Sequence, residues 1–232
     1  MCIYVHICAF IHPCSRPVAP GKGHPFPVRL AFLPGFRKNL ARPGPVEPMS
    51  LEFELQQFPK EIQLKDGSRA SLRPLRTEDE ENFHEFFLAV PEAERMFIKH
   101  RVTDPQVIHD WCQNIDLGRN LPLLAFMEGR IIADATLHQQ LGGWKRHIGR
   151  VSVLVQPKYR GRGLAKALVT EIISIARHQS LERVEAEFIG EQEAAMKVFA
   201  LLGFSTLMRL EDYVKDMQAI THDYVLMGLR AE

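Results

Sequence analysis

The sequence predicts an α/β (α+β) fold in a single domain, with a mixed, mostly antiparallel central sheet of six to seven strands and helices on both faces. Two observations support this prediction. A β-branched run at residues 151–155 is followed by a glycine-rich turn and then, from Leu164, by apolar residues at three- and four-residue steps, so a strand changes into a helix there. Around this unit, strand-like and helix-like stretches alternate from residue 61 to the C-terminus.

Residues 1–48 differ from the rest of the chain. They hold nine of the fifteen prolines, three of the four cysteines and six basic residues against one acidic residue. Proline at this density prevents a packed element, so we expect a disordered extension. The composition of this segment fits neither a signal peptide nor an amphipathic transit peptide. Its cysteines and histidines include no Cys-x-x-Cys pair, so no metal site is predicted. Met49 resembles an ordinary start, and we expect that residues 1–48 reflect a misassigned initiation codon and that residues 49–232 form the domain.

The first half of the domain combines a hairpin, three helices and two strands. An Asp-Gly pair supplies the hairpin turn, the pattern Thr77-Glu-Asp-Glu80 is a capping box, and phenylalanines at helical spacing give the first helix a buried side. The expected elements are a hairpin over residues 61–75, helices starting near residues 77, 91 and 103, and strands over residues 121–127 and 131–138.

The second half adds four strands and two helices. Apolar and charged residues alternate over residues 182–189, which is typical of a strand with one buried face, and Gly203 ends the last helix. The expected elements are strands over residues 151–155, 182–189, 205–210 and 223–229, and helices from residue 164 and over residues 191–202.

The turn between the central strand and its helix carries the chemistry. It reads Arg160-Gly-Arg-Gly163, and Lys166 lies in the first helical turn. The first amides of a helix have no partner inside it, and its dipole is positive at that end, while glycine lets a ligand approach the backbone. These features predict a phosphate or pyrophosphate site. A P-loop and a dinucleotide fingerprint are both excluded, because Ala167 follows Lys166 and Lys166 replaces the third glycine.

The string Val-x-Val-x-Pro-x-Tyr-Arg-Gly-x-Gly-x-Ala, from Val153 to Ala165, resembles the coenzyme A signature of the GNAT superfamily of acyl-CoA-dependent N-acyltransferases. The order of the elements from residue 61 onward and the ending Leu-Gly203-Phe204 are similar to the same superfamily. The opening residues 64–80 resemble, less specifically, the acetyltransferase domain of bacterial protein-lysine acetyltransferases.

This resemblance implies acetyl-CoA as co-substrate and no metal. Backbone amides over residues 160–166 would hold the pyrophosphate, and the pantetheine would pair with residues 153–155, where an amide near Val155 would polarise the thioester carbonyl. Gln192 matches an Asn that binds the cofactor in many members. The implied cofactor-binding residues are Val153, Leu154, Val155, Arg160, Gly161, Arg162, Gly163, Leu164, Ala165, Lys166 and Gln192.

The catalytic residues of the family are not matched. Phe199 stands where many members have a Tyr that protonates the thiolate, and Arg150, which stays protonated, stands near the position of a catalytic Glu. The remaining candidates are Glu187 and His138 for the base and Tyr213 for the acid, with a water chain as an alternative. Each competes with an ordinary surface or packing role.

Two function classes follow. The first is an N-acetyltransferase that transfers an acetyl group from acetyl-CoA to an amino group of a small molecule or protein. The second is a non-catalytic acyl-CoA-binding sensor, which the missing catalytic residues favour.

The composition of the chain limits the classes of partner that we expect for it. Residues 49–232 carry 23 basic and 27 acidic residues and no basic stripe with interleaved aromatics, so nucleic acid is not an expected partner. No apolar run approaches the roughly 20 residues that span a bilayer, so no membrane association is expected. Cys112 is the one cysteine after residue 48, which suits a cytoplasmic setting. The strand edges near the C-terminus allow a homodimer.

Overall fold

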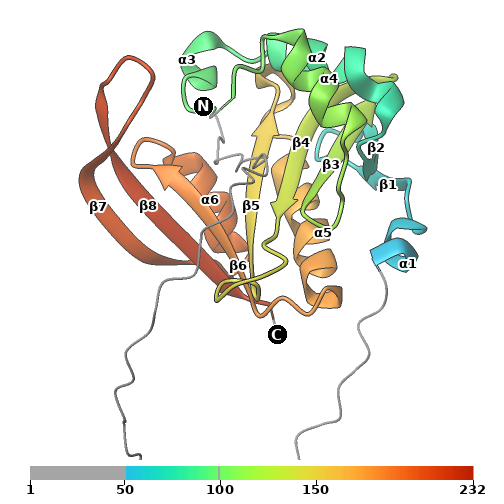
Figure 1. Cartoon of the computed structure of the whole chain (residues 1–232). Helices are drawn as coiled ribbons and strands as arrows, with labels where there is room; N and C mark the ends of the chain where they lie inside the picture. The colour runs from blue at the N-terminus through green and yellow to red at the C-terminus, as the bar shows by residue number, and fades with distance from the viewer. Residues whose placement is uncertain (1–50, 99, 232) are drawn as a thin grey trace, which may run out of the picture. The chain divides into compact units, whose positions relative to one another are not determined.

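The chain builds one sheet of eight strands in the order β1-β2-β3-β4-β5-β6-β8-β7 (Figure 1). The structure is a computed structural model that describes residues 51–98 and 100–231, and the predictions for residues 1–48 lie outside this range. The strands are β1 (Lys60–Gln63), β2 (Arg69–Pro74), β3 (Asn120–Met127), β4 (Arg130–His138), β5 (Ile148–Val155), β6 (Arg183–Ile189), β7 (Ser205–Lys215) and β8 (Thr221–Arg230). The helices are α1 (Leu51–Leu55), α2 (Glu80–Leu88), α3 (Glu92–Arg95), α4 (Pro105–Gln113), α5 (Leu164–His178) and α6 (Glu193–Leu201).

The strand pairing confirms the predicted mixed, mostly antiparallel sheet. Only β5 and β6 run parallel, and every other neighbouring pair is antiparallel. The sheet has eight strands rather than six to seven, because all eight strands expected along the chain pair within it, with β1 and β7 at its two edges.

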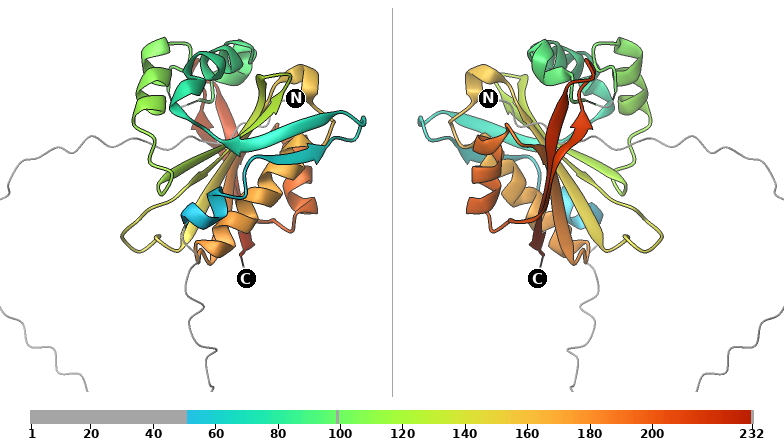
Figure 2. Two further views of the ribbon diagram at one scale, coloured as in Figure 1. Left: turned by 90° about the vertical axis from the view of Figure 1, so that its right-hand side faces the viewer. Right: turned by 90° about the vertical axis from the view of Figure 1, so that its left-hand side faces the viewer.

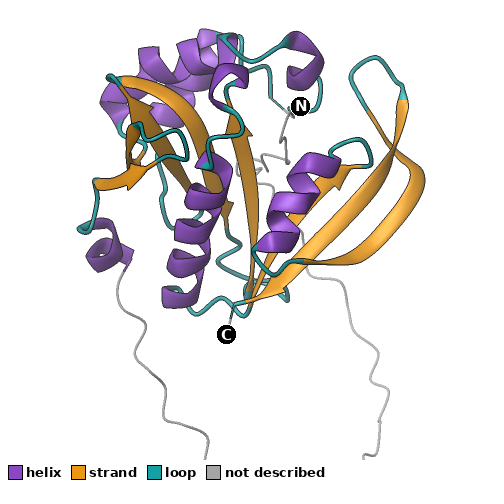
Figure 3. Cartoon of the chain, turned by 180° about the vertical axis from the view of Figure 1, so that it is seen from behind, coloured by secondary structure: helices purple, strands orange, loops and turns teal. Residues whose placement is uncertain are grey.

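Helices cover both faces of the twisted sheet (Figure 2). Helices α2 and α4 cover one face, where the α2 residues Phe86 and Phe87 pack in one cluster with Leu124 and Leu154 of the sheet. On the other face, α5 and α6 cover the sheet when it is seen from behind (Figure 3), and the apolar stripe of α5, with Leu168 at its centre, is fully buried. Burying one such side chain contributes about 1.5–3 kcal/mol, so the apolar contacts on both faces stabilise the sheet.

Two local predictions were wrong in detail. The Thr77–Glu80 capping box is not formed: a 3-10 turn over Thr77–Asp79 precedes α2, and Asp79 accepts the Arg76 amide at 2.9 Å while it also binds the Arg73 guanidinium at 2.6 Å. Strand β7 extends five residues beyond the predicted 205–210, and β8 exceeds the predicted 223–229 by three residues, because the outer part of this hairpin is exposed and its sequence shows no apolar alternation. None of the helices in the described part of the chain is both long and apolar enough to cross a bilayer.

Candidate active site

The parallel strands β5 and β6 separate after a short paired stretch. Their register is limited to three pairs, from Ile148↔Arg183 to Arg150↔Glu185. Beyond that point β5 continues to Val155 and β6 to Ile189 without further pairing, and Figure 1 shows β6 leaning away from β5. The sheet is therefore open along one edge of β5, inside the fold.

The backbone of β5 presents hydrogen-bonding groups to this opening. The Gln156 amide donates to the Ile132 carbonyl of β4 at 3.0 Å. Because the peptide groups of an antiparallel strand alternate in direction, Leu154 also faces β4, whereas Val153 and Val155 direct their N–H and C=O groups toward the opening. Of the three residues expected to pair with pantetheine, Val153 and Val155 thus have the required orientation.

The glycine turn leads directly from β5 into α5. Gly161 and Gly163 both have positive φ, 79° and 94°, which favours glycine, and a Cβ at Gly161 would meet no atom within 4 Å. Gly163 is the N-cap of α5, so the amides of Leu164, Ala165 and Lys166 have no acceptor within the helix. An anion fits against these amides, because the helix dipole is also positive there.

The arginines of the turn are already engaged by carboxylates. Arg160 forms a two-point contact with Glu94, at 2.9 and 2.6 Å, and its Nε donates to the Val155 carbonyl at 3.0 Å. Arg162 pairs with Asp66 at 2.8 Å. The side chain of Arg160 therefore connects the turn to α3. Of the three cationic residues predicted for the site, Arg160, Arg162 and Lys166, only Lys166 is exposed to solvent.

A second lysine reaches the turn from the β1–β2 hairpin. The Lys65 amide donates to the Arg162 carbonyl at 3.0 Å, and the Lys65 Cγ and Cε atoms lie 3.6 and 3.7 Å from the position that a Gly163 Cβ would occupy. The Lys65 side chain thus extends across the N-terminus of α5. Its contribution was missed in the sequence, since only the fold brings the two segments together.

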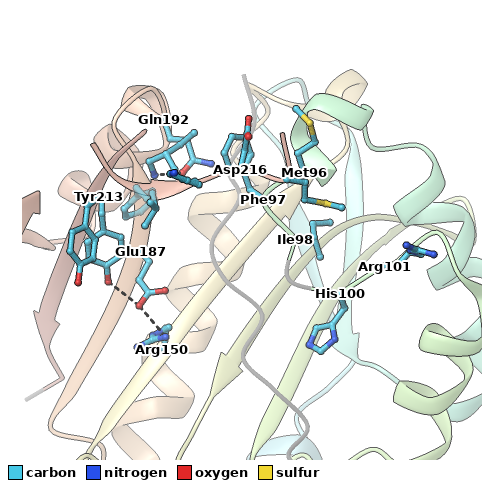
Figure 4. Close-up of a pocket in the computed structure, with 16 residues that line it drawn as sticks. Met96, Phe97, Ile98, His100, Arg101, Arg150, Glu187, Gln192, Tyr213 and Asp216 are labelled. Carbon is cyan, nitrogen blue, oxygen red and sulfur yellow. Dashed lines mark hydrogen bonds and ion pairs between the residues drawn. The ribbon is translucent and has the colours of Figure 1, made fainter. Parts of the chain in front are cut away.

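A cavity of about 840 Å³ lies between the end of β6, the β7–β8 hairpin and the segment after α3 (Figure 4). Its walls are largely apolar and aromatic, and its charged groups come from β5, β6, the hairpin and Arg101 in the segment after α3. The lining residues used below are Phe97, Arg150, Glu187, Gln192, Tyr213 and Tyr224.

Glu187 is the central carboxylate of this cavity. Its Oε1 atom lies 3.0 Å from the Arg150 Nη1 and accepts a hydrogen bond from the Tyr224 hydroxyl at 3.0 Å. Burial, followed by the nearby Glu187 charge, raises the pKa of Tyr224 well above its usual range, so this hydroxyl keeps its proton. Of the three predicted catalytic residues, Glu187 is the one that the structure places in a defined polar contact within the cavity.

His138 lies elsewhere, in a buried polar row on the sheet face that α2 and α4 cover. Its Nδ1 lies 2.7 Å from the Asn120 Oδ1 and its Nε2 lies 3.2 Å from the Ser152 Oγ. Asp134 continues the row, and burial raises the pKa of its carboxyl to about 7, although the Thr136 hydroxyl opposes this shift. His138 does not line the cavity formed by the described residues, and its catalytic role stays a prediction.

The other predicted residues fall into distinct places. Tyr213 lines the cavity from an exposed position on β7, with its ring 6.0 Å from that of Tyr224. Gln192 lines it from the start of α6, where its Oε1 accepts the Ile189 amide at 3.1 Å. Phe199 is fully buried between Phe188 and Phe204, so its side chain is part of the core.

Sequence reasoning missed Glu94, Lys65 and Tyr224. Glu94 and Lys65 show no local pattern that marks them. Tyr224 lies in a predicted strand, and only the pairing of β6 with β8 brings it beside Glu187.

Within residues 51–98 and 100–231, no three His, Cys, Asp or Glu side chains are grouped to hold a metal ion.

The comparisons with known proteins agree with this geometry. The Acetyltransferase (GNAT) family matches residues 74–204, more than half of the chain. N-alpha-acetyltransferase MAK3 of Arabidopsis thaliana is 29% identical over 118 residues, which is 50% of this chain and 61% of that protein, so the chain spans about three fifths of this relative's length.

Three solved structures show the same fold. The GNAT domain of S. lividans PAT is 23% identical with a TM-score of 0.62, covering 74% of this chain and 96% of that one. The ribosomal-protein-S5-alanine acetyltransferase of Vibrio fischeri is 18% identical with a TM-score of 0.64, covering 75% and 97%. The acetyltransferase yncA of Salmonella typhimurium, solved with acetyl-CoA, is 17% identical with a TM-score of 0.60, covering 70% and 94%. With its open β5–β6 edge, its glycine turn and its family match, the chain belongs to the acetyltransferase (GNAT) family.

Proposed function

We propose that the protein transfers an acetyl group from acetyl-CoA to a primary amine by direct attack of the amine on the thioester. The observation that carries this proposal is the opening between β5 and β6, which has an anion-binding turn at the end of β5 and the Glu187 cavity beside β6. A co-substrate bound along the opening would bring its reactive end near the amine, and such proximity lowers the barrier.

The residues of the opening fit acetyl-CoA. The amides of Leu164, Ala165 and Lys166 would hold the pyrophosphate, Val153 would pair with the pantetheine, and the Val155 amide would polarise the carbonyl. Gln192 would contact the co-substrate from the start of α6. Acetyl-CoA supplies an acetyl group activated as a thioester.

Glu187 is the proposed general base. The amine nitrogen becomes much more acidic as its bond to the acetyl carbon forms, so a carboxylate can remove its proton. His138, which is buried and outside the lining of the cavity, would act through other groups, and Tyr213 would contact the acceptor from the exposed side.

The acceptor is proposed as an amino group of a protein or small molecule. The names of two relatives, an N-alpha-acetyltransferase and a ribosomal-protein-alanine N-acetyltransferase, support a protein amino terminus, while the name phosphinothricin N-acetyltransferase, given to another structural neighbour, supports a small molecule. We further propose that the protein is cytoplasmic and has neither nucleic acid nor a membrane as a partner. It would form a homodimer through the edge strand β7.

The second candidate is a non-catalytic acyl-CoA sensor. A sensor is favoured because the buried ring of Phe199 stands where many family members have a Tyr hydroxyl. A sensor binds acetyl-CoA without consuming it, so turnover separates the two proposals.

The test is a thiol-release assay on the full chain with acetyl-CoA and three amine sets: peptides with free amino termini, terminally blocked peptides with a free lysine, and small amines. We expect turnover with at least one set. Acetyl-CoA binding without turnover in any set would favour the sensor, and absence of binding would reject both proposals.

Lys65→Ala is expected to weaken acetyl-CoA binding by about tenfold, because an ammonium close to a phosphate contributes roughly 1–2 kcal/mol at a partly exposed site. Arg69→Ala removes an exposed positive charge from the same hairpin and is the matched control, for which we expect no change. Isothermal titration of both variants measures the dissociation constant. Equal effects of the two substitutions would show that only the overall charge of the hairpin matters.

A further inference from the structure

The two oxygens of Glu187 are held in different ways. Oε1 receives both the Arg150 guanidinium and the Tyr224 hydroxyl, each at 3.0 Å. No side chain of the described residues forms a hydrogen bond with Oε2. In Figure 4 the dashed lines from Glu187 end on one carboxylate oxygen, and the other oxygen points away from them. One oxygen is thus fixed by protein groups and the other is available to a ligand in the cavity.

The two donors come from strands on either side of β6. Arg150 is the last β5 residue that pairs with β6, so its contact with Glu187 bridges the two strands where they begin to separate. Tyr224 approaches from β8, where it lies opposite Ile189. Because three strands fix this arrangement and the Glu187 side chain is only 14% exposed, the carboxylate is held in one orientation.

We propose that Arg150 and Tyr224 are positioning residues that hold Oε1, so that Oε2 is the atom that exchanges protons with the acceptor. This inference rests on the proposed acetyl transfer. As the nitrogen–carbon bond forms and the carbon–sulfur bond breaks, the amine proton moves to Oε2, and Oε2 then returns it to the thiolate. The products are the acetylated amine and a thiol, and the carboxylate is regenerated. One carboxylate thereby serves both steps in a site where Phe199 supplies no hydroxyl.

Tyr224 suits this role because it remains a donor. Its pKa is raised by burial and by the Glu187 charge, so the hydroxyl stays protonated over the working pH range. A hydrogen bond donated to a carboxylate oxygen fixes the direction of that oxygen. The loss of this hydroxyl should therefore leave Glu187 less firmly oriented.

The test is Tyr224→Phe, which keeps the ring beside Tyr213 and removes only the hydroxyl. In carbon NMR at pH 8 of protein labelled with [13C]glutamate, with Glu187→Gln to assign the signal, we expect the Glu187 carboxyl resonance to shift in Tyr224→Phe, because Oε1 loses a hydrogen-bond donor. With the best amine from the acceptor assay, we expect kcat to fall about tenfold at pH 8 and KM to change less than twofold.

Tyr213→Phe is the matched control, since it removes a hydroxyl from the neighbouring ring of the same cavity, and it should leave the Glu187 resonance unchanged. Arg150→Lys keeps a cation near Oε1 and should retain more kcat than Arg150→Gln. A Tyr224→Phe protein whose Glu187 resonance and kcat match those of the wild type, or a Tyr213→Phe protein with the same change of resonance, would overturn the positioning role. Absence of turnover in the wild type would reject the proposed function, and the NMR comparison would still test the contact.

Discussion

Gly163→Glu is expected to abolish acetyl-CoA binding in a chain that still folds. Gly163 caps α5 with φ of 94°, so a Glu there is strained by about 1–2 kcal/mol and places a carboxylate beside the amides of Leu164 and Ala165. A new Cβ would approach Lys65 no closer than 3.6 Å, which is ordinary contact. The domain should therefore fold, while the added charge repels a pyrophosphate. We expect at least a hundredfold loss of affinity.

Thermal unfolding measures this loss. A ligand that binds only the folded state adds about 2.7 kcal/mol at a hundred times its dissociation constant, which raises the melting temperature of a protein of this size by roughly 5–10 °C. We expect this increase for the full-length wild type and none for Gly163→Glu.

Gly129→Glu provides the control for backbone strain. Gly129 also has positive φ, 76°, with no atom within 4 Å of a new Cβ, and it lies in the β3–β4 turn outside the site. This variant should lose a similar amount of stability and keep the acetyl-CoA response. If Gly163→Glu kept the response too, the α5 N-terminus would not be the binding site.

The strand, glycine turn and helix could be predicted because their signals are local. Pro157, the two positive-φ glycines and the apolar stripe of α5 lie within about twenty residues, and each acts through its own backbone or through the next turn. The family match, over residues 74–204, includes this segment. Sequence reasoning was therefore most accurate where the structure depends least on distant contacts.

The electrostatics of the site could not be predicted for the opposite reason. Arg160 was expected to add positive charge for a phosphate, but its guanidinium binds Glu94, which lies 66 residues away. His138 was weighed against an ordinary surface role, but it is buried between Asn120 and Ser152. Such partners are set by how distant segments pack and pair in the fold, and one sequence does not reveal that packing.

The catalytic assignment illustrates the same limit of local patterns. Glu187 alternates with apolar residues on β6, as a residue on a solvated face would. It becomes distinctive only when Arg150 and Tyr224 converge on it from β5 and β8. The difference between a surface carboxylate and a catalytic one is therefore tertiary here.

Glu187→Gln is expected to lower kcat by about 10²–10³-fold, because general acid–base catalysis contributes on this order and Gln cannot accept a proton at the same position. Gln has nearly the same shape, and its amide oxygen can still accept from the Tyr224 hydroxyl. The KM for acetyl-CoA should change less than twofold, since the residues proposed to bind it lie in the glycine turn and on β5. Steady-state kinetics with the accepted amine, at pH 6 to 9, measures both constants.

Glu185→Gln is the matched control for this substitution. Glu185 lies two residues earlier on the same face of β6 and is outside the lining of the cavity, so the same change of charge there should leave kcat unaltered. Because the proposed site has one carboxylate for both proton transfers, the loss of kcat should be present in Glu187→Gln across the whole range from pH 6 to 9 and absent in Glu185→Gln. Activity retained by Glu187→Gln above a tenth of the wild-type value would assign the proton transfer to solvent, with the carboxylate serving only to hold β5 and β6 together through Arg150.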